Sequence, residues 1–148
     1  MVANSIEIAR RPEEVFAYVE QADRHPEWQE KLLSSKPETE GPLRVGSRIE
    51  QVRRVPGGPR KFTIEVTEHE PPRKISWRAI NGPVRPVGTV TVEPADDGSR
   101  SRLTVQIDLR GHGLLGKLIA PLASRDAARQ LPRDHARLKE RLERAESA

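Results

Sequence analysis

Three aromatic side chains are the residues of this chain best suited to gripping a small molecule. The chain has only five aromatic residues: two tryptophans, two phenylalanines and one tyrosine. Trp28 and Trp77 each offer a large apolar face and one N–H donor, which suits a flat or ring-shaped ligand. Phe62 shares a predicted strand face with Ile64. We expect all three to contact a ligand, although packing in an ordinary core would account for the same residues.

A predicted strand over residues 47–55 carries charged residues on both of its faces. If Ile49 points inward, Gln51 and Arg53 also point inward. If the strand has the opposite phase, Glu50, Val52 and Arg54 point inward instead. A buried charge needs a partner or a ligand, so this strand is a place for a polar determinant of binding. The candidates for an interior acid or base are Glu50, Arg53 and Arg78. Charges that reach solvent at a twisted sheet edge are the alternative.

The residue patterns of several chemical mechanisms are missing from the chain. It has no cysteine, so disulfides, thiolate metal sites and cysteine nucleophiles are excluded. Its four histidines are widely spaced, without an HxH or HxxxH pair, so no metal site is expected. GxSxG, a phosphate-binding loop and GxGxxG are all absent. We assign no catalytic residue and expect no cofactor. His135 lies on an apolar stripe between Leu131 and Leu138, which favours a core histidine.

The elements that would position these residues are predicted from hydrophobic periodicity and turn signals. Alternating residues predict a first strand near 3–9, and Pro12 with two following acids opens a helix whose buried face is Val15, Phe16 and Val19. A second short helix holds His25 to Trp28. An extended stretch over 32–40 precedes the strands predicted near residues 47–55, 60–70, 74–80, 87–93 and 100–110.

A long amphipathic helix is predicted from Leu114 to about Glu146. Its leucines and Ile119 would close a cavity against the sheet, and Leu115 and Ile119 join the predicted ligand contacts. Pro132 cannot donate the backbone hydrogen bond that the Ala128 carbonyl would accept. We therefore expect a break or kink between Gln130 and Arg133.

Length and composition indicate one domain over residues 1–148 with a sizeable core. The net charge of +4 is modest, and the basic residues are scattered among acids, so nucleic acid is not an expected partner. The chain has no run of 18 apolar residues, so no integral membrane segment is expected. No secretory signal is visible at the N-terminus, which makes a cytoplasmic protein the default.

The order of several short segments resembles the polyketide cyclase/dehydrase and lipid-transport family of the START-like, or SRPBCC, helix-grip superfamily. The segments are Ser5-Ile6-Glu7-Ile8, Arg11-Pro12-Glu13-Glu14-Val15-Phe16, His25-Pro26-Glu27-Trp28, Gly46-Ser47, Gly98-Ser99-Arg100-Ser101-Arg102-Leu103 and Leu138-Lys139-Glu140-Arg141-Leu142-Glu143. The resemblance implies an α+β helix-grip fold of the START/Bet v1 type: a curved antiparallel sheet wrapped around the long C-terminal helix, with two short helices after the first strand.

The resemblance also implies a function. Members of the family bind or transform lipids, sterols and polyketides, so we expect a small hydrophobic molecule as the partner, bound or transported in a sheet–helix cavity of several hundred Å3. Two alternatives stay open: a polyketide cyclase or dehydratase acting in the same cavity, and a protein-interaction module with a collapsed cavity. Whether the chain catalyses a reaction, and whether it forms a homodimer, is left open.

Overall fold

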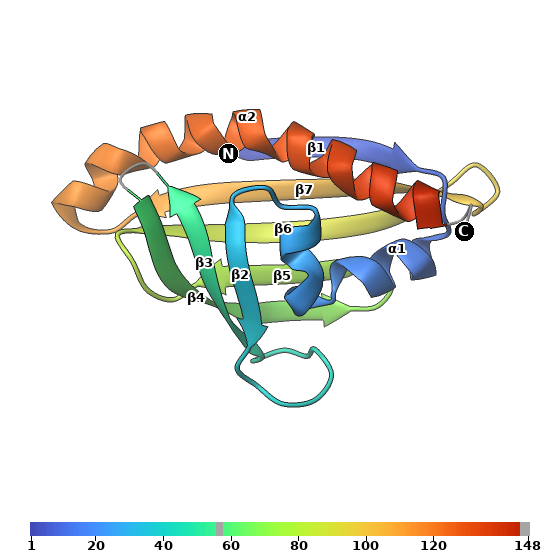
Figure 1. Ribbon diagram of the computed structural model, residues 1–148, viewed down its shortest axis with the longest axis horizontal. Helices are drawn as coiled ribbons and strands as arrows, with labels where there is room; N and C mark the ends of the chain where they lie inside the picture. The colour runs from blue at the N-terminus through green and yellow to red at the C-terminus, as the bar shows by residue number, and fades with distance from the viewer. Residues whose placement is uncertain (56–57, 146–148) are drawn as a thin grey trace.

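The structure, a computed structural model, describes residues 1–55 and 58–145 and consists of one curved sheet with a long helix across its inner face (Figure 1). The strands are β1 (Val2–Ile8), β2 (Leu32–Pro37), β3 (Arg48–Val55), β4 (Gly58–Glu70), β5 (Lys74–Ala79), β6 (Val84–Ala95) and β7 (Arg100–Gly111). The helices are α1 (Pro12–Val19), the 3-10 helix η1 (Ala22–Glu27) and α2 (Gly113–Ala145). The predicted α+β helix-grip fold, with two short helices after the first strand, is confirmed.

All seven strands pair antiparallel in the order β1-β7-β6-β5-β4-β3-β2. The consecutive strands β2 to β7 form a meander, and β1 closes the sheet beside β7, where Ile6 pairs with Leu103. The extended stretch near 32–40 thus contributes a seventh strand, β2, at the sheet edge. Strands β3 and β4 form a hairpin in which Val55 pairs with Gly58. Pro56 and Gly57 lie outside the described residues, as does Glu146, the expected end of the helix.

Helix α1 forms for the reasons expected from its sequence. Pro12 occupies the first turn, and Glu13 and Glu14 stand at the positive end of the helix dipole. Its predicted apolar face, which comprises Val15, Phe16 and Val19, is buried in the main core. That core lies beneath the second half of α2, where Leu138 is fully buried against the sheet. Burying one such leucine contributes about 2 kcal/mol.

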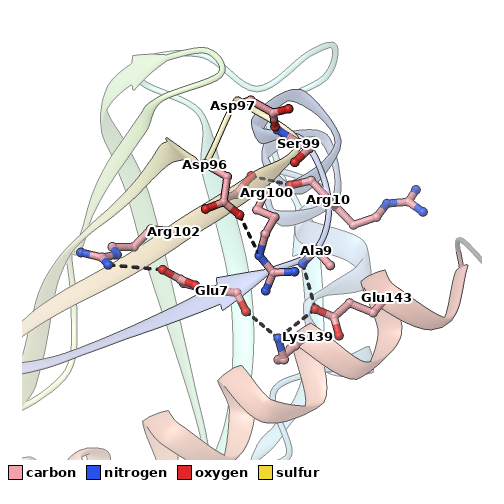
Figure 2. Close-up of polar contacts among 11 residues, drawn as sticks. Glu7, Ala9, Arg10, Asp96, Asp97, Ser99, Arg100, Arg102, Lys139 and Glu143 are labelled. Carbon is pink, nitrogen blue, oxygen red and sulfur yellow. Dashed lines mark hydrogen bonds and ion pairs between the residues drawn. The ribbon is translucent and has the colours of Figure 1, made fainter.

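The C-terminal end of α2 is fastened to the end of β1 by polar contacts (Figure 2). Lys139 Nζ donates to the Glu7 carbonyl oxygen at 2.7 Å, and Glu143 Oε2 accepts from both Lys139 Nζ and the Ala9 amide at 2.8 Å. Burial opposes the charge on Glu143, yet these two donors lower the pKa of its carboxyl. Nearby, Ser101 Oγ donates to the Arg10 carbonyl oxygen at 2.7 Å, which holds β7 against the β1–α1 corner.

The N-terminal end of α2 is held by close backbone packing instead. Gly116 is buried, and a Cβ there would overlap the Pro83 carbonyl oxygen of the β5–β6 turn. The same carbonyl accepts a hydrogen bond from the His112 amide at 2.8 Å. On β7, a Cβ at Gly111 would lie 2.7 Å from the Lys117 amide nitrogen. The first turn of α2 therefore lies directly on the backbone of the sheet end.

The predicted break at Pro132 is wrong, because α2 runs without interruption from Gly113 to Ala145 and contains Pro121 as well. The helix is bent over its length (Figure 1), and a kink at Pro132 itself stays a prediction. Packing of Leu131, Asp134 and His135 on both sides of the proline holds the backbone helical. Pro132 and Ala128 are both exposed, so the proline ring lies in solvent and water can reach the Ala128 carbonyl. Tertiary packing thus outweighs the roughly 3 kcal/mol that a proline costs in a helix interior.

Gly116→Ala tests the close contact at the start of α2. In an open helix this change would stabilise the protein by up to about 1 kcal/mol. Here the added methyl group meets the Pro83 backbone, so we expect the free energy of unfolding to fall by about 1–3 kcal/mol. Denaturant unfolding followed by circular dichroism measures the change, and a stabilised variant would contradict the contact.

Candidate ligand-binding site

The phase of β3 decides which of its charges faces the interior. Ile49 and Gln51 are 3% and 5% exposed, and Ile49 pairs with the buried Ile64 of β4. Arg53 continues this inner face, whereas Glu50 and Arg54 point outward. Gln51 Nε2 donates to Ser35 Oγ of β2 at 3.3 Å, so a buried polar pair lies beside the arginine. The ambiguity in the sequence is resolved in favour of the Ile49 phase.

The Arg53 guanidinium is an interior cation without a direct carboxylate partner among the described residues. Its Nη2 donates to the neutral Gln29 side chain at 2.6 Å. Burial lowers the pKa of Arg53, and Asp134 and Asp126 on α2 act on it electrostatically in the opposite direction. An arginine stays protonated at neutral pH even so. Within the described residues, Gln29 is the only hydrogen-bond partner of the guanidinium.

A polar bridge joins the middle of α2 to the β2 side of the sheet. Asp134, only 6% exposed, accepts hydrogen bonds from Gln130 Nε2 at 2.9 Å and from the Glu30 amide at 3.2 Å. Burial nevertheless raises the pKa of Asp134. About two turns earlier on α2, Lys31 Nζ lies 2.6 Å from Asp126 Oδ1. These contacts were not foreseen, because nothing in the linear sequence pairs residues about one hundred positions apart.

Phe62 and Trp77 are half-buried apolar residues on the inner face of the sheet; Phe62 is diagonal to Arg53, whereas Trp77 pairs with Val66 further along β4. Phe62 is paired with Gln51 across β3 and β4, and both aromatic side chains are half-buried beside the Ile49–Ile64 cluster. Trp77 lies flat across Gly88 of β6, where a Cβ would come within 2.7 Å of the indole Cε2. Glycine inside a predicted strand is a sequence signal of such a close approach, and it was the clue available for this arrangement.

The inner face is sealed at one end and open at the other. Beneath the second half of α2, Val90, Val105 and Leu103 are buried, whereas further along β7 Ile107 and Leu109 are only half-buried. The helix explains the difference. Its sheet-facing residues are large in the second half and small in the first; the small ones are Gly116, Ala120, Ala123 and Ala127. Solvent therefore reaches the apolar inner face beneath the first half of α2.

Trp28 is placed differently from the other two aromatic candidates. It is 6% exposed within the main core, and its ring meets that of His25 edge-on with centroids 5.7 Å apart. Its buried Nε1–H has no hydrogen-bond partner among the described residues. His25 Nε2 donates to the Val19 carbonyl oxygen at 2.7 Å. The core alternative thus accounts for Trp28 packing, and its role as a ligand contact stays a prediction.

Three of the expected interior residues lie on outer surfaces, which corrects the sequence interpretation. Glu50 and Arg78 face outward because each alternates along its strand with an inward neighbour. Glu50 pairs with Lys61 at 3.5 Å, and Arg78 pairs with Glu65 at 2.9 Å. Leu115 is 63% exposed, since Gly116 takes the sheet-facing position of the first turn. Ile119 is half-buried near the sheet-facing side.

Two hollows of about 300 and 350 Å3 lie away from these residues. The smaller lies between α1, Arg73 and β6. The larger lies beside η1 and the β2–β3 loop, where His69 Nε2 and Glu20 Oε2 are 2.9 Å apart. Neither hollow is lined by α2, so the cavity expected beneath residues 114–131 stays a prediction. Among residues 1–55 and 58–145, no three His, Asp or Glu side chains gather as metal ligands.

His135 is a fully buried core residue, as its place on the apolar stripe predicted. The Asn4 Nδ2 amide donates to His135 Nδ1 at 2.7 Å, which leaves the proton of the neutral ring on Nε2. That Nε2–H has no partner in the part of the chain that the structure describes. Burial lowers the pKa of His135 to about 4.

Comparison with known proteins identifies the family. A family model described as polyketide cyclase/dehydrase and lipid transport matches residues 1–143, and the chain belongs to this family. Its fold resembles that of a START superfamily protein from Mycobacterium smegmatis, with a TM-score of 0.79, 16% identity and 97% of each chain covered. No curated protein matches the chain in sequence.

Two aromatase/cyclases are also similar in fold. The Zhui aromatase/cyclase from Streptomyces sp. R1128 aligns over 97% of this chain and 93% of its own, with a TM-score of 0.78 and 16% identity. The di-domain ARO/CYC BexL from the BE-7585A biosynthetic pathway aligns over 94% of this chain and 45% of its own, with a TM-score of 0.72 and 19% identity.

Within the described residues, no helix is long and apolar enough to cross a membrane.

The pKa of His135 leads to a prediction about stability and pH. The unfolded chain protonates this imidazole below about pH 6.5, whereas the folded chain does so only near pH 4. Protons therefore favour unfolding, and stability should fall by about 3 kcal/mol as the pH drops through this window. Because His25 and Asp134 also have shifted pKa values, the test is the difference between wild type and His135→Phe in denaturant unfolding at several pH values. Equal pH slopes for the two proteins would contradict it.

Proposed function

We propose that this protein binds a small, mostly hydrophobic molecule, such as a lipid or a polyketide, between the inner face of the sheet and the first half of α2. The half-buried rings of Phe62 and Trp77, both packed against the Ile49–Ile64 cluster, carry the proposal, because apolar rings on the inner face gain from being covered. Membership of a family described as polyketide cyclase/dehydrase and lipid transport supports the ligand class. Ile119 would contact the ligand from the helix side.

Arg53 gives the proposed ligand a polar requirement. A guanidinium on an apolar surface favours a molecule with a carboxylate, enolate or phenolate oxygen at one end. Its neutral partner Gln29 leaves the positive charge uncompensated by direct contact. The ligand would then lie with its apolar part on Phe62 and Trp77 and its oxygen-bearing end toward β3.

A cyclase or dehydratase reaction is the second candidate function, and the same arginine favours it. Polyketide cyclisation passes through enolate oxygens, and a fixed cation beside an apolar surface stabilises such charge as it develops. The third alternative, a collapsed interaction module, requires a packed interior. The half-buried Phe62 and Trp77 count against a packed interior at this end, although an exposed apolar patch is present on α2.

Fluorescence of Trp77 tests the binding proposal. In a Trp28→Phe background the emission comes from Trp77 alone, and we expect it to shift when long-chain lipids or aromatic polyketides are added. Trp77→Phe in the otherwise wild-type chain should keep the fold and weaken binding about tenfold, through loss of ring area. Isothermal calorimetry measures the affinity. If no compound of the panel changes the Trp77 emission or produces heat, the proposal is wrong.

The polar requirement is tested by a pair of neighbouring arginines. Arg53 faces inward and Arg54 outward on the same strand, so they form a matched pair of charge deletions. We expect Arg53→Gln to weaken binding of a fatty acid by about tenfold or more, and to affect the corresponding fatty alcohol much less. Arg54→Gln should leave both affinities unchanged. Equal losses for acid and alcohol would show that Arg53 acts only through packing.

A further inference from the structure

The outward face of the first half of α2 is apolar at its start and basic further on. Leu114, Leu118 and Leu122, spaced four residues apart, are 80%, 67% and 62% exposed. Arg125, Arg129 and Arg133 continue the same face over the next turns, and all three are exposed. We call these six residues the leucine–arginine face. It lies opposite the sheet-facing residues and belongs to the end of the molecule remote from α1 (Figure 1).

The leucine exposure is unusual for a water-exposed helix. Three leucines on successive turns make a continuous apolar strip, which single scattered leucines would not. The close packing of Gly116 on Pro83 turns this face outward, so the leucines cannot rotate into the core. The strip needs a partner that offers an apolar environment.

The charge on this face selects the partner. Between residues 113 and 133 the only acid is Asp126, which is already paired with Lys31. Arg125, Arg129 and Arg133 form no ion pair with any acid that the structure describes. An uncompensated row of arginines is complementary to an anionic partner. The second half of α2 differs, because its basic residues Arg137, Lys139 and Arg144 pair with Glu30, Glu143 and Glu140.

A second copy of the chain does not fit this face. In an antiparallel pair of α2 helices, the arginines of one copy would cover the leucines of the other and lose water without gaining a counter-charge. In a parallel pair, arginines would meet arginines. Both arrangements bury unpaired guanidinium groups, which is costly.

We propose that the leucine–arginine face docks the protein on an anionic lipid bilayer, with the leucines at the start of α2 inserted among the acyl chains and the arginines on the phosphates. Leu118 and Arg129 are eleven residues apart, or roughly 16 Å along the helix. A helix that enters obliquely can therefore place leucines below the headgroups and arginines at their level. This docking is reversible surface binding and does not depend on the proposed ligand site, which lies on the opposite side of the helix.

Vesicle flotation tests the proposal. We expect the wild-type protein to float with vesicles of equal parts phosphatidylcholine and phosphatidylglycerol, to float weakly with phosphatidylcholine alone, and to dissociate as salt is raised. The triple variant Leu114→Ser, Leu118→Ser, Leu122→Ser should lose at least about tenfold in partitioning. Its circular dichroism spectrum should be unchanged, since these side chains contact solvent.

A charge-matched pair of triple variants separates docking from general electrostatic attraction. Arg125→Gln, Arg129→Gln, Arg133→Gln should weaken partitioning about a hundredfold, since each basic residue near an anionic surface contributes about a factor of five. Arg11→Gln, Arg73→Gln, Arg102→Gln removes the same charge from exposed sites elsewhere and should have little effect. The proposal is overturned by equal effects of the two triple variants or by indifference to the leucines. It is overturned too if light scattering shows a wild-type dimer that the serine variant converts to a monomer.

Discussion

Helix α2 is held at its two ends by different kinds of contact, and the rest of the structure depends on this. At the C-terminal end, large apolar side chains fill the space above the sheet, and Lys139 and Glu143 fasten the helix to β1. At the N-terminal end, Gly116 brings the helix backbone directly onto Pro83. Between these ends the sheet-facing residues are alanines, which reach only a short distance. The helix therefore spans the sheet without sealing it along its whole length.

The interior of the protein also has two different parts, one beneath each end of α2. One end of the inner face is an ordinary core in which Ile8, Leu103 and Leu138 are fully buried. The other end combines half-buried rings with Gln51, Arg53 and the Asp134 bridge. Desolvating an arginine and a carboxylate costs free energy, which only hydrogen bonds and opposite charge partly recover. A protein selected for stability alone would gain from apolar residues there, so polar groups beside half-buried aromatic rings support the proposed binding of a molecule with both kinds of surface.

The two faces of the first half of α2 have separate proposed roles. The sheet-facing side is lined with small residues and borders the proposed ligand site. The outward side displays leucines followed by arginines and is the proposed membrane surface. A hydrophobic ligand has low solubility in water, so a binding site that opens beside a membrane-docking face would let the ligand pass between bilayer and protein over a short distance.

Local patterns in the sequence were enough to predict most of the strands and helices, because alternation, turn residues and the proline and acids at the start of α1 act over a few residues each. The resemblance to the family supplied the helix-grip arrangement of these elements. The core role of His135 followed from the same periodicity. Tertiary structure alone decided the phase of β3, since Ile49 and Val52 are equally apolar and only pairing with Ile64 separates them. It also decided that Leu115 faces solvent, because the contact of Gly116 with Pro83, in a turn far earlier in the chain, fixes the rotation of the helix. It decided as well that α2 continues through Pro132, because core packing on both sides outweighs the local cost of a proline.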